Sequence, residues 1–264
     1  MFDDEDEEYF EGNLSEDLER FEAHLKGESI GFLDSDRLEA LIDHYLINSQ
    51  YTKAKTCADH AISQFSYNPL FHLRKAQAIS AIGQLKEALH ILSAIEKWET
   101  PSCEFLLTKA SIFSQLRDSK NAIKYFKEAL VLSEPEDRDE IYLDLAMEYE
   151  NANDYKNAVA VLKEAIKYNA HNEGAIYEIA FCYDQLGEYE NAIKCYSGFI
   201  DENPYSFTAW YNLGNAYSKL DDFEKAVWAY DYCVLINEEF GPVYFNLGNA
   251  YLSQEKYKDA IEQF

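Results

Sequence analysis

The heptad YNLGNAY occupies residues 211–217, and FNLGNAY occupies residues 245–251, so the sequence nearly repeats itself after 34 residues. Working outward from these heptads, alanines recur at spacings of 34, 34, 36, 34, 34 and 34 residues. They are Ala54, Ala88, Ala122, Ala158, Ala192, Ala226 and Ala260. A fixed period of this length predicts an array of small stacked units.

The spacing within each period predicts a pair of helices. With the recurring alanine as position 20, a small residue stands at position 8 in every unit except the first, which has Ile42. Positions 4, 7, 8 and 11 share one helical face, and positions 20, 24 and 27 share another. Small residues at 8 and 20 let two backbones approach closely. Turn-forming residues stand between the two faces at Gly83, Gly187, Asn153-Asp154 and Asp221-Asp222. We therefore predict an all-α solenoid.

The sixth unit carries the pattern of a known family. Trp210 stands at position 4, Leu213-Gly214 at 7 and 8, and Tyr217 at 11, followed by Ala226 and Tyr230 at 20 and 24. This pattern resembles the tetratricopeptide repeat, which implies a right-handed superhelix of helix–turn–helix units. The resemblance covers units at 35–68, 69–102, 103–138, 139–172, 173–206, 207–240 and, incomplete, 241–264. Ile42, His72 and Ile79 depart from the pattern in the first two units.

Composition limits the class of partner. The 264 residues carry a formal net charge of −26, which disfavours binding to nucleic acid and to anionic membranes. Residues 1–11 are predicted to be an acidic disordered tail, with docking to a basic partner as the alternative. No apolar run approaches the length of a membrane span, and the acidic N-terminus is unlike a secretory signal. The five cysteines are scattered, so we expect reduced thiols in a cytoplasmic protein.

Residues 12–34 are predicted to be an N-terminal capping helix and loop, with Ser15 as the N-cap. The stretch 9–25 also resembles the opening of the zinc-binding anti-sigma domain, through Gly12, Leu14-Ser15 and His24-Leu25. The cysteines of that family are missing after His24, so the resemblance implies no zinc site. We expect no metal ligands and no cofactor.

No catalytic motif is present: HExxH, GxGxxG, GxxxxGK and GxSxG are all absent from the sequence. We therefore predict a non-enzymatic scaffold that binds another protein or an extended peptide. The sequence ends at Phe264, in the middle of a predicted helix. The alternative is a sensory or substrate-recruiting arm of a longer enzyme or signalling protein with its output domain beyond Phe264. Self-association through the incomplete unit is a further possibility.

The resemblance implies a concave groove lined by positions 2, 5, 6, 9, 12 and 13 of each first helix. Asn212 and Asn215 occupy positions 6 and 9 of the sixth unit, and Asn246 and Asn249 those of the seventh. An amide both donates and accepts, so such a ladder could pair with a peptide backbone. The asparagine ladder of O-linked N-acetylglucosamine transferase is similar. The alternative is that these asparagines are only consensus residues of the repeat.

Charge and aromatic residues at the same positions suggest the character of the ligand. Arg74 and Lys219 are the only cations there, which disfavours a clamp for a ligand carboxylate. Nine acids share these positions: Asp36, Glu39, Asp43, Glu104, Glu140, Asp144, Glu150, Glu178 and Asp184. We expect Asp144, Glu178 and Asp184 to select a basic ligand. Tyr177, Phe181 and Tyr211 would hold its apolar side chains, or pack on neighbouring helices instead.

Overall fold

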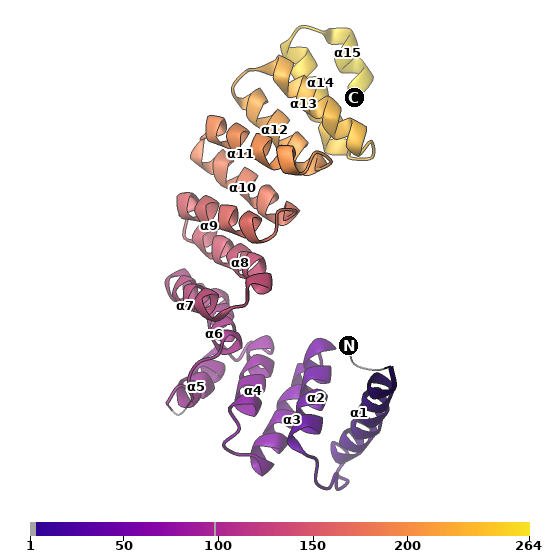
Figure 1. The fold of residues 1–264 in the computed structure, drawn as a ribbon, viewed down its shortest axis with the longest axis vertical. Coiled ribbons are helices and arrows are strands. Elements are labelled where there is room, and N and C mark those ends of the chain that lie inside the picture. The colour runs from indigo at the N-terminus through magenta and orange to yellow at the C-terminus, as the bar shows by residue number, and fades with distance from the viewer. Residues whose placement is uncertain (1–3, 98) are drawn as a thin grey trace. The chain divides into compact units, whose positions relative to one another are not determined.

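Every element that the computed structural model describes, over residues 4–97 and 99–264, is a helix (Figure 1). The helices fall into two compact units, Met1–Asp118 and Ser119–Phe264. Within each unit, antiparallel helices pair and stack on their neighbours in chain order, as in a repeat solenoid. This confirms the predicted all-α repeat architecture.

The first unit holds six helices among its described residues. They are α1 (Asp4–His24), α2 (Ser35–Ile47), α3 (Tyr51–Gln64), α4 (Pro69–Ala81), α5 (Leu85–Ile95) and α6 (Cys103–Gln115). The second unit begins with α7 (Ser119–Leu132) and a 3-10 turn, η1 (Pro135–Asp137). It continues with α8 (Arg138–Asn151), α9 (Tyr155–Tyr168), α10 (Glu173–Leu186), α11 (Tyr189–Glu202), α12 (Phe207–Lys219), α13 (Phe223–Ile236), α14 (Gly241–Ser253) and α15 (Tyr257–Gln263).

The first helices of the predicted repeats, which we call A helices, begin at or within one residue of the expected positions. Most follow an N-cap side chain that accepts a hydrogen bond from the first turn. These N-caps are Asp34, Asn68, Ser102, Asn172 and Ser206. Some of these N-cap side chains also hydrogen-bond to the preceding A helix: Asn172 Nδ2 donates to Asp139, and Ser206 Oγ donates to Glu173. The cap therefore starts one helix and fixes its register on another.

The turn from each A helix to its partner, the B helix, contains one residue with positive φ. These residues are Ser49, Gly83, Arg117, Asn153, Gly187, Asp221 and Glu255, with φ between 56° and 88°. They repeat with the period of the buried alanines, so every unit closes with the same left-handed turn. Only two of the seven positions hold glycine, the residue that adopts this conformation without steric cost.

Small and large residues face each other between the A and B helices. A Cβ atom added at Gly214 would lie 2.5 Å from Cδ1 and 3.0 Å from Cζ of Tyr230, and one added at Gly248 would lie 2.7 Å from Cζ of Phe264. In the first repeat the sizes are exchanged, with Ile42 at position 8 and Ala58 at position 24, both fully buried. The departure at Ile42 is therefore compensated within its own unit.

Helix α1 differs from the sequence prediction at its start. The helix begins at Asp4, so residues 4–11 of the predicted disordered tail are helical, and Ser15 lies inside the helix instead of capping it. Acidic residues at a helix N-terminus are favoured by the helix dipole, which explains how this segment can extend the helix. Residues 1–3 of the predicted tail lie outside the described residues.

Helix α1 is held to α2 and α3 by polar and aromatic contacts. The Asp17 carboxylate is only 2% exposed and accepts hydrogen bonds from Arg37 and Arg20. Lys53 lies 2.5 Å from Glu22, and Phe21 is fully buried against Tyr45. These contacts place α1 on the open face of the first repeat, where we expected a capping helix.

Candidate functional site

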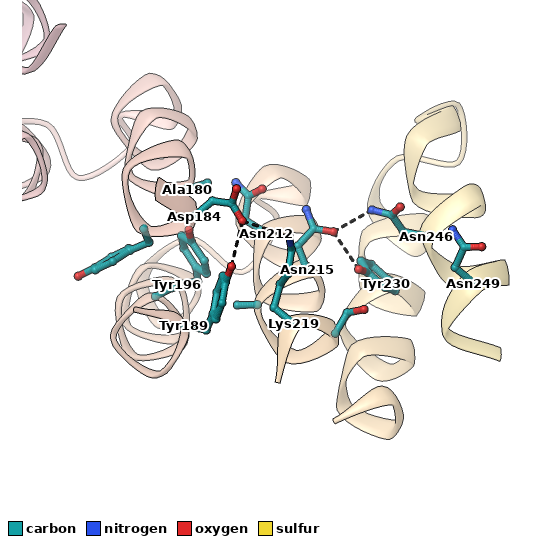
Figure 2. Close-up of a pocket in the computed structure, with 14 residues that line it drawn as sticks. Ala180, Asp184, Tyr189, Tyr196, Asn212, Asn215, Lys219, Tyr230, Asn246 and Asn249 are labelled. Atoms are coloured by element: carbon teal, nitrogen blue, oxygen red, sulfur yellow. Dashed lines mark hydrogen bonds and ion pairs between the residues drawn. The ribbon is translucent and has the colours of Figure 1, made fainter. Parts of the chain in front are cut away.

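A pocket of about 380 Å³ opens on the second unit, between the A helices α10, α12 and α14 (Figure 2). Helices α11 and α13 contribute tyrosines to it. Its lining combines asparagines and charged residues with tyrosines and alanines: Ala180, Tyr183, Asp184, Tyr189, Ala192, Tyr196, Asn212, Asn215, Ala216, Ser218, Lys219, Tyr230, Asn246 and Asn249. All four predicted asparagines and Asp184 therefore line one pocket.

Asn212 is the most buried of the four asparagines, with 7% of its surface exposed. Its Nδ2 atom is fully buried and has no hydrogen-bond partner within the described part of the chain. A buried donor that is left unpaired costs about 1–3 kcal/mol. The Asn212 side chain lines the pocket, so a rotation of its amide would bring this donor to a ligand acceptor. Asn249, by contrast, is exposed at the rim.

Asn215 and Asn246 are joined in a hydrogen-bond network with two tyrosines. Asn215 Oδ1 accepts from Tyr230 OH at 2.8 Å and from Asn246 Nδ2 at 2.8 Å (Figure 2). Asn246 Nδ2 also donates to Tyr211 OH at 3.0 Å. Burial raises the pKa of Tyr230, so its hydroxyl keeps its proton and can donate. The network links α12, α13 and α14, and it couples the orientations of the two amides.

Asp184 lies at the opposite side of the pocket, beside a cation. Its Oδ1 is 3.4 Å from Lys219 Nζ and accepts from Tyr189 OH at 3.3 Å. Lys219 also lies 6.0 Å from the centre of the Tyr189 ring. The predicted selector of positive charge is thus already neutralised by a lysine of the same chain. Arg74 is matched in a similar way in the first unit, where it forms ion pairs with Glu39, Asp43 and Glu104.

The remaining predicted site residues lie outside this pocket. Tyr177 on α10 is 65% exposed, and Phe181 on the same helix is 45% exposed, with its ring edge-on to Tyr155 at 5.9 Å. Tyr211 is half-buried and packs on Phe240 at 5.0 Å. The structure therefore brings Tyr211 close to the asparagines through its hydroxyl, while Tyr177 and Phe181 remain separate.

Two predicted acids, Asp144 on α8 and Glu178 on α10, have no ion-pair partner among the residues described. Burial raises the pKa of both carboxyl groups. The neighbouring carboxylates of Glu140 and Glu148 raise the pKa of Asp144 further. These groups hold negative charge at a cost, and a cation from outside the chain would relieve it.

The sequence prediction missed the tyrosines that B helices contribute to the pocket, namely Tyr189, Tyr196 and Tyr230. Tyr196 and Tyr230 stand at position 24, which was assigned to packing between helices. Their rings do pack, since both side chains are almost fully buried. The sequence feature that could have identified these two rings is the small residue at position 8 of the same unit, Ala180 or Gly214. A small residue there lets the ring lie close to the A helix and reach the pocket.

Residues 4–97 and 99–264, which the structure describes, lack the features of two other kinds of site. No helix there is long and apolar enough to cross a bilayer. No group of three or more histidine, cysteine, aspartate or glutamate side chains is arranged there to hold a metal ion.

Comparisons with known proteins identify the repeat. Residues 115–199 match the model of anaphase-promoting complex (cyclosome) subunit 3, and residues 182–221 match a TPR repeat model. Residues 207–240 and 241–264 match a tetratricopeptide repeat model. No curated protein matches the chain.

Solved structures of repeat proteins share the fold. MamA is 23% identical, with a TM-score of 0.51 over 61% of this chain and 87% of its own. YrrB, a TPR protein with an unusual peptide-binding site, is 18% identical, with a TM-score of 0.53 over 75% of this chain and 97% of its own. A tetratricopeptide repeat protein from Parabacteroides merdae is 17% identical, with a TM-score of 0.53 over 86% and 90%. The repeat spacing, the helix pairs and these matches together show that the chain is a tetratricopeptide repeat protein.

Proposed function

We propose that this chain is a non-enzymatic scaffold whose A-helix face binds an extended segment of another protein. Asn212, Asn215, Asn246 and Asn249 pair with the ligand backbone. Tyr177, Phe181 and Tyr211 contact its apolar side chains. Asp144 and Glu178 favour a basic sequence, and Asp184 joins them when a ligand cation displaces Lys219.

The observation that carries the proposal is the buried, unpaired Nδ2 of Asn212 at the pocket wall. Proteins rarely leave such a donor without a partner, so each one calls for an explanation, and a bound ligand would supply one here. An extended backbone supplies carbonyl oxygens at regular intervals, so it suits a row of amides on successive A helices. YrrB, which shares the fold, is described as a peptide-binding protein, and this supports the same class of ligand here.

The preference for a basic ligand rests on Asp144 and Glu178. Three other acids at groove positions, Asp184, Glu39 and Asp43, are paired with Lys219 or Arg74. Asp144 and Glu178 have raised pKa values and no cation beside them in the described structure. A lysine or arginine of the ligand would stabilise their charged forms, and the exposed rings of Tyr177 and Phe181 on α10 would add cation–π contacts.

A peptide array tests both parts. Acetylated, amidated peptides of matched length, in basic, neutral and acidic series, are screened against the purified chain. We expect basic peptides to bind best, and Asn212→Ala with Asn246→Ala to weaken the best binder by about tenfold or more. Asn191→Ala, on the B helix α11 and outside the pocket lining, is the control. Equal binding of basic and acidic series refutes the charge selection, and unchanged affinity of the double variant refutes the asparagine ladder.

A second candidate role is that of a recruiting arm in a larger enzyme, signalling protein or assembly. The match of residues 115–199 to a subunit of the anaphase-promoting complex supports it, since that protein belongs to a multi-subunit assembly. Reading the gene beyond the codon for Phe264 decides between the two roles. A catalytic or DNA-binding segment there favours the arm, and further repeats followed by a stop favour the scaffold.

Self-association is a further part of the proposal. Tyr257, Ile261 and Phe264 on and after α15 expose more than half of their surfaces. Such an apolar face would be covered in a dimer. Sedimentation equilibrium should then show a concentration-dependent mass, which Ile261→Lys abolishes. We place these interactions in the cytoplasm, where the five cysteines of the chain would remain thiols.

A further inference from the structure

The two amides at the centre of the pocket have lost part of their hydrogen-bonding capacity to each other. Asn215 Oδ1 has two lone pairs, and both are used, by Tyr230 OH and by Asn246 Nδ2. Asn215 can therefore offer a ligand only its Nδ2 hydrogens. One turn away on α12, Asn212 lines the same pocket and carries a second donor without a partner, the buried Nδ2. Helix α12 thus faces the pocket with donors.

Asn246 on α14 has the opposite character. Its Nδ2 carries two hydrogens, and both are used, one by Asn215 Oδ1 and one by Tyr211 OH. The remaining atom, Oδ1, has no hydrogen-bond partner among the described residues and can only accept. Figure 2 shows the Asn215 and Asn246 side chains meeting across the gap between the two helices.

From this division we infer that the pocket reads the polarity of a peptide main chain, with ligand carbonyl oxygens turned toward α12 and ligand N–H groups toward α14. This inference rests on the proposed function, because it specifies how the bound backbone is oriented. An unfixed row of amides could rotate to suit either orientation of a backbone. Here Tyr230 and Tyr211 act as positioning residues, because their bonds to Asn215 and Asn246 couple the two amides and leave only two arrangements in which all of these groups are paired.

The arrangement has one self-consistent rival. If both amides turned over and both tyrosine hydroxyls reversed their roles, α12 would present Asn215 Oδ1 and α14 would present Asn246 Nδ2. The structure holds the first arrangement, in which Asn215 Oδ1 accepts from Tyr230 OH and from Asn246 Nδ2. The two arrangements predict different exchange behaviour for the side-chain amide hydrogens.

Nuclear magnetic resonance of the free, ¹⁵N-labelled protein distinguishes them without any ligand. We expect slow solvent exchange for the Asn246 side-chain NH₂, whose hydrogens are both bonded, and fast exchange for that of Asn215. The Asn246→Asp variant assigns the Asn246 signal by its disappearance. The reverse pattern of protection would overturn the inference, even where peptides bind.

The same variant tests the consequence for binding. The introduced carboxylate has no hydrogen to give, so Asn215 must turn its Nδ2 toward it and its Oδ1 toward the ligand. We expect Asn246→Asp to weaken the best acetylated, amidated array peptide about tenfold more than Asn249→Asp does. Asn249→Asp adds the same charge one turn along α14 but stands outside the network.

The outcomes separate the two proposals. Equal losses in the two aspartate variants, with the wild-type protein still binding the peptide, would overturn the inference and leave the proposed function standing. A wild-type protein that binds none of the peptides would refute the proposed function, while the exchange pattern still decides how the amides are oriented. Circular dichroism spectra of both variants confirm that they fold.

Discussion

Replacing Gly214 by alanine tests how the A and B helices of the sixth repeat pack. Gly214 lies inside α12, and the ring of Tyr230 on α13 lies directly against its Cα. An added Cβ would stand 2.5 Å from Tyr230 Cδ1, a separation that packed carbon atoms do not reach. The ring must move, and its hydroxyl is also a donor to Asn215. One methyl group should therefore disturb both the core and the pocket.

The expected magnitude is a balance of two effects. Glycine to alanine within a helix gains about 1 kcal/mol of stability from backbone entropy. Forcing an extra methyl group into a packed site costs about 1–3 kcal/mol. Gly214→Ala should therefore destabilise by up to about 2 kcal/mol. Gly198→Ala is the matched control, because a Cβ at Gly198 in α11 meets no described atom within 4 Å, and it should stabilise by about 1 kcal/mol.

Urea denaturation followed by circular dichroism measures the free energy of unfolding of both variants. A double-mutant cycle gives the sharper result. Tyr230→Leu alone should leave a void, yet the double variant restores the alanine–leucine pairing found at Ala76 with Leu92 and at Ala146 with Leu162. We expect the two changes to be coupled by about 1–3 kcal/mol. Additive effects, or a Gly214→Ala variant as stable as Gly198→Ala, would refute this account of the packing.

Three further predictions follow from other contacts. Ser49→Gly and Arg117→Gly relieve the strain of left-handed backbone at φ 56° and 59°, so each should raise the free energy of unfolding in urea titrations by about 1 kcal/mol. Gly187→Ala should lower it. A loss of stability in the two glycine variants would contradict the strain. The raised pKa values of Asp144 and Glu178 mean that the folded state binds protons more tightly than the unfolded state, so their cost is present above the folded pKa and is relieved as the pH falls through it. Stability measured from pH 7 downward should rise less in Asp144→Asn with Glu178→Gln than in the wild type, and identical profiles would contradict this. The hydrogen bond from Lys53 lowers the pKa of Glu22, so the stability that Glu22 adds is present above the unfolded pKa near 4.5 and is lost as the pH falls through the folded pKa. Glu22→Gln should therefore remove this loss of stability at acidic pH. A Glu22→Gln profile as steep as that of the wild type would argue against it.

The repeat was predictable because its signals are local. The alanines at position 20 are all buried, and each unit repeats the same short-range spacing of small and large residues. Turn residues were recognised where they are glycine, asparagine or aspartate. The equivalent turns at Ser49, Arg117 and Glu255 escaped notice because serine, arginine and glutamate carry no such preference. There the packing of the two helices imposes the conformation on residues that disfavour it.

The pocket was predictable only in part, because its walls come from different repeats. The spacing of Asn212 and Asn215 placed both amides on one face of a helix, and the structure has them lining the same pocket. Nothing in the spacing indicated that Asn215 would bond to Asn246, 31 residues away, or that Lys219 would lie beside Asp184. Such pairings depend on the offset between neighbouring A helices, which one repeat read alone does not contain.

The same contacts bear on whether the asparagines serve the repeat or a ligand. The two alternatives are compatible, because an amide has two ends. The Oδ1 of Asn215 and the Nδ2 of Asn246 tie α12 to α14 and so stabilise the stack, while their other ends are left for the pocket. Asn212 has no such hydrogen bond at its buried Nδ2, so packing alone does not explain why an amide is present at this position. An isosteric Asn212→Leu change should therefore hold or raise the free energy of unfolding while abolishing peptide binding, and a purely structural asparagine would show the opposite.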